Sequence, residues 1–156
     1  MNFIAPLNSL GFGIYSFGYL KAFESLGVKI NLHPIGSDKN KLWAGSSEAS
    51  ELAKVFGITE YDTYIKNSIN SKENTLILWH PDQIVDYIIP NSINYGYTHF
   101  ETSDFASDHR KKLKIINNKI KSIHVSNQWA SNILSSYGIC SDPIIYGPAM
   151  PLYINT

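Results

Sequence analysis

FIAPLNSLGFGIYSFGYLKAFESLGVKINLH, Phe3–His33, is the stretch that decides the fold. It opens with a short apolar strand, Phe3–Ala5, and passes through a glycine-containing loop into a predicted helix, Ile14–Leu26. Gly27 stands where a helix-ending glycine belongs. Val28–His33 then alternates apolar and polar residues, as a half-buried strand does. This strand–helix–strand unit is typical of a parallel sheet.

Predicted strands and helices continue to alternate beyond this unit. The further strands are Thr75–Trp79, Ile93–Phe100, Ser122–Val125 and Pro143–Tyr146, and the further helices are Ser47–Phe56, Tyr61–Ile69, Pro81–Ile89, Ser107 or Asp108 to Lys119, and Gln128–Tyr137. The alternation predicts an α/β fold, with a single Rossmann-like, doubly wound sheet. We expect a mainly parallel sheet of about six strands, with helices on both faces.

Composition limits the class of protein. The chain has 156 residues, of which 44% are hydrophobic, so it can form one domain with its own core. Its formal net charge is zero and gives no overall field to attract nucleic acid or membrane. Cys140 is the single cysteine, which excludes a disulfide framework. No apolar run approaches the ~20 residues of a membrane span, and nothing resembles a signal peptide. We therefore expect a cytoplasmic protein.

The glycines of the predicted loop Leu7–Gly13 form the first candidate site. Gly11, Phe12 and Gly13 lead into a helix N-terminus, where free N–H groups and the helix dipole suit a phosphate. A dinucleotide fingerprint needs a third glycine three residues after the second, and the next one here is Gly18. The loop therefore predicts either a phosphate-facing site or a tight turn, and it lacks the nicotinamide-cofactor pattern.

YGYTHFETSD, Tyr95–Asp104, ends a predicted strand and runs directly into polar groups. His99 and Glu101 lie two residues apart and would share one face of that strand. Glu101 is our candidate for acid–base work or for binding a sugar hydroxyl, and capping of the next helix is the alternative. A metal would need a third ligand, such as His80 or Asp104. We expect neither a metal nor a separate cofactor.

Polar residues also follow two other predicted strands. His80 and Asp82 come after a buried strand, at the carboxyl end where ligands of α/β sheets bind, and a simple turn is the alternative. Ser126 and Asn127 open a helix whose free N–H groups would meet a polar ligand, or they only cap that helix.

Basic residues concentrate in Arg110–Lys121, which holds six of the thirteen in the chain. Such a segment suits the phosphates of an acceptor, of nucleic acid or of a lipid surface. A solvated helix face is the other interpretation.

Three segments, in this order, resemble the N-terminal half of a two-Rossmann-domain (GT-B) glycosyltransferase of the family 4 kind. Leu7–Ile30 is similar to that family's opening glycine loop, first helix and second strand. YTHFETSD, Tyr97–Asp104, looks like its T-x-F-E-T segment. Asn117–Ile139 looks like the passage in which a helix ends, a strand reaches a Ser, and a helix leads to Gly-Ile.

The resemblance implies transfer of a sugar from a nucleotide-sugar donor to an acceptor. In such enzymes the N-terminal domain holds the acceptor, and its glycine loop, here Gly11 and Gly13, approaches the donor diphosphate. Many members place a His near the transferred sugar, and the matching position here is Glu101. By the same matching, Thr102 and Ser126 would lie nearby.

The family's donor-binding C-terminal domain has no counterpart in this sequence. We therefore expect residues 1–150 to form the acceptor-binding domain, and 151–156 to begin a truncated linker. Such a half would be inactive alone. It would be a truncated reading frame, one domain cut from a longer protein, or a subunit that a separate donor-domain chain completes. The alternative is a non-catalytic Rossmann-like module that binds a ligand or a protein partner.

Overall fold

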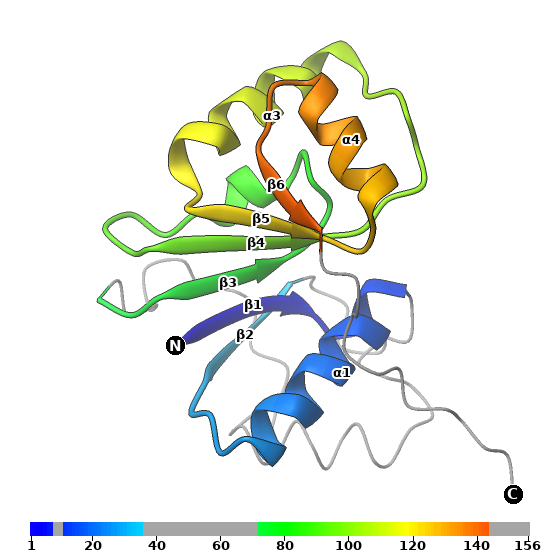
Figure 1. Ribbon diagram of the computed structural model, residues 1–156. Helices are drawn as coiled ribbons and strands as arrows, with labels where there is room; N and C mark the ends of the chain where they lie inside the picture. Colours follow the sequence, from blue (N-terminus) through cyan, green and yellow to red (C-terminus); the bar gives the residue numbers. More distant parts are fainter. Residues whose placement is uncertain (8–10, 36–71, 144–156) are drawn as a thin grey trace, which may run out of the picture.

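The computed structural model describes residues 1–7, 11–35 and 72–143. Within these ranges, six strands form one sheet in the order β2-β1-β3-β4-β5-β6, and every neighbouring pair is parallel (Figure 1). The strands are β1 (Asn2–Pro6), β2 (Asn31–Ile35), β3 (Thr75–Leu78), β4 (Asn94–Thr98), β5 (Ser122–Val125) and β6 (Ser141–Pro143). The helices are α1 (Gly11–Ser25), the short 3-10 helix η3 (Ile84–Tyr87), α3 (Ser107–Lys119) and α4 (Gln128–Ser136). The predicted α/β fold is confirmed.

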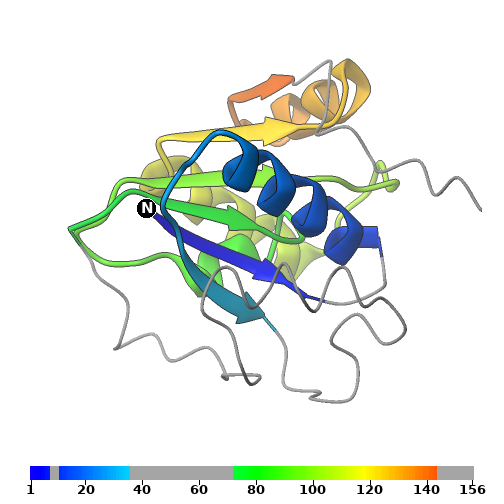
Figure 2. The same cartoon turned by 90° about the horizontal axis from the view of Figure 1, so that it is seen from below.

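Helices cover both faces of the sheet. In Figure 1, α1 lies on one side and α3 and α4 lie on the other, and Figure 2 shows α1 lying over the sheet. Phe3 and Ile4 are both fully buried because successive strand residues point to opposite faces. Phe3 packs in the core under α1, and Ile4 packs in the core that includes Leu113 of α3. The sheet is therefore the middle of three layers.

The strand order reverses at β1. Phe3 of β1 pairs with Leu32 of β2 on one side and with Leu76 of β3 on the other, and β4 to β6 follow beyond β3. In doubly wound sheets such a reversal opens a crevice outside the carboxyl ends of the strands, and ligands bind there. The carboxyl ends of β1 and β3 therefore mark the first place to look for a site.

Several predicted element ends are confirmed. Asn127 caps α4, because its Oδ1 accepts the N–H of Ala130 at 2.9 Å. Gly27 and Gly138 have φ of 65° and 77°, a conformation that glycine adopts without the steric cost of a Cβ. Both follow a helix, as the sequence indicated.

Other predicted ends are wrong. α1 begins at Gly11 rather than Ile14, so Gly11–Gly13 form its first turn. The N–H groups of a first turn have no intrahelical acceptor in any helix, and weak helix formers are therefore tolerated there. β2 runs to Ile35 through Pro34, which an edge strand accommodates. The N-cap of α3 is Ala106, without a side-chain cap, so neither Ser107 nor Asp108 caps this helix.

Two further boundaries shift. Pro81 lies in a turn that precedes η3, rather than in the first turn of a helix to Ile89. β6 begins at Ser141, before the predicted start at Pro143, and the rest of the predicted last strand, 144–146, lies outside the described residues. The predicted helices Ser47–Phe56 and Tyr61–Ile69 and the linker 151–156 lie outside the described residues. Among the residues described, no helix is both long and apolar enough to cross a membrane.

Candidate functional site

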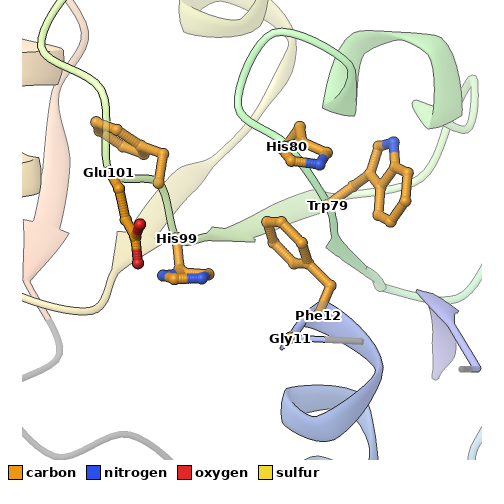
Figure 3. A pocket seen from close by; sticks show the side chains of 7 residues that line it. Gly11, Phe12, Trp79, His80, His99 and Glu101 are labelled. Carbon is orange, nitrogen blue, oxygen red and sulfur yellow. The ribbon is translucent and has the colours of Figure 1, made fainter. Parts of the chain in front are cut away.

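A pocket of about 390 Å³ opens at the carboxyl ends of β1, β3 and β4, where the strand order reverses (Figure 3). Three segments line it: the first turn of α1, the two residues that follow β3, and the loop after β4. Its lining residues are Gly11, Phe12, Trp79, His80, His99, Phe100 and Glu101. Five of the predicted site residues, Gly11, Phe12, His80, His99 and Glu101, are thus brought together.

Phe12 is the centre of the aromatic wall. It projects from the first turn of α1 between His80 and His99 (Figure 3). Its ring centroid lies 4.6 Å from that of His80, 5.3 Å from that of His99 and 5.5 Å from that of Trp79. The indole Nε1–H of Trp79 donates to Oε1 of Gln83 at 2.7 Å, and this hydrogen bond holds the orientation of the indole ring. The pocket therefore has fixed aromatic faces.

His99 and Glu101 both line the pocket, although β4 has already ended at Thr98. The two residues converge through the loop rather than through strand alternation. His99 also contacts Tyr15 of α1, with 5.2 Å between ring centroids. Glu101 is exposed, and the N-terminus of α3 has no side-chain cap, so helix capping does not explain this carboxylate.

Burial lowers the pKa of His80, and the neighbouring His99 acts in the same direction, while the Asp82 carboxylate opposes them. The neutral imidazole is therefore favoured at neutral pH. A neutral imidazole donates one hydrogen bond and accepts one, which suits a hydroxyl group rather than an anion.

Tyrosines form the layer behind His99. Tyr15 contacts both His99 and Tyr97, and Tyr19 meets Tyr97 edge-on at 5.4 Å. Burial, with a smaller effect from Tyr15, raises the pKa of Tyr97 to about 12. The Tyr97 hydroxyl is buried and finds no hydrogen-bond partner among the described residues. This layer supports His99, and the raised pKa keeps the Tyr97 hydroxyl protonated at neutral pH.

A second hollow, of about 410 Å³, adjoins the pocket. It shares His80 and Phe100 with the first, and its other lining residues are Pro81, Asp82, Gln83, Thr102, Asp104, Phe105, Ala106 and His109. Thr102 therefore lies in the second hollow, where its hydroxyl donates to the Asp104 carbonyl at 3.0 Å. Asp82 lies there as well, with its Oδ2 3.5 Å from Nδ1 of His109.

The remaining predicted site residues are not among the described residues that line either hollow. Gly13 is buried in α1, and Ser126 and Asn127 stand at the start of α4. Asn127 acts as the helix cap, which was the alternative reading of this pair.

The basic segment Arg110–Lys121 is partly paired. Arg110, Lys111 and Lys112 each lie within ion-pair distance of an aspartate, namely Asp104, Asp108 and Asp86 respectively. The Asp104 carboxyl has a lowered pKa because Arg110 and Tyr137 donate hydrogen bonds to it. Arg110 therefore binds the loop before α3 and Lys112 binds η3, whereas Lys111 pairs within α3 itself.

Sequence reasoning missed Trp79, Phe100 and His109. The two aromatic residues were assigned to strand ends, yet each follows the last residue of its strand by one or two positions. Their place beside His80 and Glu101 was the signal that could have identified them. His109 carries no such signal, because its approach to Asp82 depends on how α3 packs.

The site combines aromatic faces, imidazoles and a carboxylate, with the start of a helix at one side. Apolar walls with a few convergent polar groups are typical of small-molecule sites. Within residues 1–7, 11–35 and 72–143, no group of three His, Cys, Asp or Glu side chains is placed to hold a metal ion. The arrangement suits a neutral ligand rich in hydroxyl groups.

No protein-family model matches the chain, and neither the curated proteins nor the solved structures contain a match.

Proposed function

We propose that this chain is the acceptor-binding domain of a glycosyltransferase that uses a nucleotide-sugar donor. One observation carries the proposal: Glu101 and His99 meet the first turn of α1 across a single pocket at the reversal of strand order. The resemblance of Leu7–Ile30, Tyr97–Asp104 and Asn117–Ile139 to that family supports the same assignment.

Each group has a role in this proposal. The ring of Phe12 packs against the C–H face of a sugar, and the neutral His80 exchanges hydrogen bonds with its hydroxyl groups. The Glu101 carboxylate accepts the hydrogen bond of the acceptor hydroxyl. As the new glycosidic bond forms and the nucleoside diphosphate leaves, this carboxylate takes the hydroxyl proton.

The start of α1 faces the donor in the same scheme. Its free N–H groups and the positive end of the helix dipole suit the diphosphate. The rest of the donor binds a further domain, on a longer form of this chain or on a separate chain. The nucleotide-sugar is a substrate, and the scheme needs no other cofactor.

Binding is tested by amide chemical shifts of the isotope-labelled chain. Methyl glycosides and a panel of UDP- and GDP-sugars are titrated separately. The proposal expects shifts that concentrate at Gly11, Phe12 and His99–Glu101. Glu101→Gln should weaken glycoside binding about tenfold or more, since it removes a charged hydrogen-bond acceptor. The matched control is Glu24→Gln, which changes an exposed carboxylate on α1 and should leave binding intact.

Turnover then separates the two functions that the sequence left open. The chain is mixed with donor domains of family 4 glycosyltransferases, and release of nucleoside diphosphate is measured. Sugar binding without release in any pairing would favour a non-catalytic ligand-binding module. If no glycoside or nucleotide-sugar changes the chemical shift of an amide in the pocket, the proposed function is wrong.

A further inference from the structure

The pocket and the second hollow are adjacent, because His80 and Phe100 line both of them. The loop after β3 gives His80 to both and Asp82 to the second, and the loop after β4 gives Glu101 to the first and Thr102 to the second. Small-molecule sites span about 300–1,000 Å³, so each hollow alone lies at the small end of that range. Together they accommodate a ligand longer than one sugar ring.

Asp82 is the buried carboxyl group of the second hollow. It is 6% exposed, and the described ion partner nearest to its carboxylate is the half-exposed imidazole of His109 at 3.5 Å. Burying a carboxyl group with so weak a partner is costly. A buried polar group with so few partners calls for a further one, such as a bound ligand.

The polar groups of the second hollow favour a neutral polyol over an anion. Asp82 and Asp104 both line it, and their charges would repel a phosphate or a carboxylate. Donors are present beside them: the imidazole of His109 and the N–H groups at the start of α3, where Ala106 provides no side-chain cap. Adjacent donors and acceptors of this kind match the hydroxyl groups of a sugar.

We propose that the second hollow is a subsite for a second sugar unit, with Asp82 and His109 as its polar contacts. This inference rests on the proposed function of the first pocket, and it makes the acceptor at least a disaccharide. The acceptor then extends from Glu101, past His80 and Phe100, toward the start of α3.

The test compares matched ligands by calorimetry. The probes are methyl glucoside, methyl mannoside and methyl N-acetylglucosaminide, against maltose, cellobiose, mannobiose and N,N′-diacetylchitobiose. At least one disaccharide should bind about tenfold tighter than its monosaccharide, with amide shifts that extend to Thr102 and His109. Asp82→Asn should bring the ratio of the two affinities close to one.

Controls separate this inference from the proposed function. His109→Gln gives a second variant on the exposed side of the pair, and it should also lower the ratio. Asp108→Asn, an exposed neighbour paired with Lys111, should leave the ratio unchanged. Glu101→Gln should weaken both ligand lengths together. Equal affinities for all pairs, or a preference that survives Asp82→Asn and His109→Gln, would overturn the subsite while monosaccharide binding still supports the first pocket. Absence of any sugar binding would overturn both.

Discussion

The ring of Phe12 meets the imidazole of His80 edge-on, with 4.6 Å between their centroids. This contact joins the first turn of α1 to the loop after β3, on the two sides of the reversal in strand order. The contact also shields part of the His80 imidazole from water, and burial is the main cause of that residue's lowered pKa. The pocket wall and the charge state of His80 therefore depend on the same ring.

Phe12→Ala should raise the pKa of His80 toward 6.5, because the imidazole regains water where the Phe12 ring contacts it. Sugar affinity should fall about three- to tenfold, since an aromatic contact is lost. Phe12→Leu keeps an apolar cover and should leave the pKa lowered. Proton NMR titration of the His80 ring measures the shift. An unchanged pKa in Phe12→Ala would show that other groups bury His80.

The variant Gly11→Ala should change nucleotide-sugar binding without weakening the fold. A Cβ built on Gly11 meets no atom within 4 Å, and Gly11 has no positive φ. The variant should therefore fold, with a free energy of unfolding equal to that of the wild type or higher by up to about 1 kcal/mol. A phosphate that approaches the start of α1 would collide with the new methyl group, so nucleotide-sugar affinity should fall. Urea unfolding and calorimetry measure the two effects. Loss of stability would contradict the open space seen at Gly11.

The place of the pocket was predictable from sequence, and its extent was not. His80, His99 and Glu101 each follow an apolar run, and the carboxyl ends of parallel strands meet at one edge. Alternation of elements does not reveal strand order, however, so the reversal at β1 had to come from the structure. The approach of His109 to Asp82 depends on packing between α3 and the loop after β3, which leaves no local pattern.

Local sequence signals also predicted the wrong ends for the helix and strand near the site. Gly11 and Gly13 are weak helix formers, and the sequence therefore favoured a loop up to Ile14. In the structure Gly13 and Phe17 are buried, so packing of α1 on the sheet outweighs the low propensity of its first turn. Pro34 likewise predicted a break, yet β2 is an edge strand and tolerates it.

Asn94→Ala should destabilise the fold without removing the pocket. Asn94 is 3% exposed at the start of β4, and its side chain makes 2.9 Å hydrogen bonds to the N–H and the carbonyl of Ile89 and to the carbonyl of Ser92. The alanine leaves buried backbone groups without partners, so the free energy of unfolding should fall by about 2–4 kcal/mol. Urea unfolding measures this fall. Asn118→Ala on the exposed face of α3 is the control, and it should change stability by less than about 0.5 kcal/mol.

Stability should fall as the pH is lowered through the range in which His33 and His80 titrate. Nε2 of His33 is buried without a hydrogen-bond partner among the described residues, and burial lowers the pKa of this imidazole below 6.5. The pKa of His80 is lowered as well. In the unfolded chain both groups bind protons at a higher pH than in the folded chain. Their contribution is therefore fully present above pH 6.5 and is lost as the pH falls through the folded pKa values.

His33→Gln tests the larger part of this effect, because it replaces the titrating ring with a neutral side chain. The unfolding free energy of the variant should depend less on pH between about 7.5 and 5 than that of the wild type. His80→Gln should flatten the curve less, since the side chain of His80 is more exposed than that of His33. Urea unfolding at half-unit pH steps measures the three curves. A wild-type curve that rises toward acid, or three identical curves, would mean that these imidazoles are not held neutral by the fold.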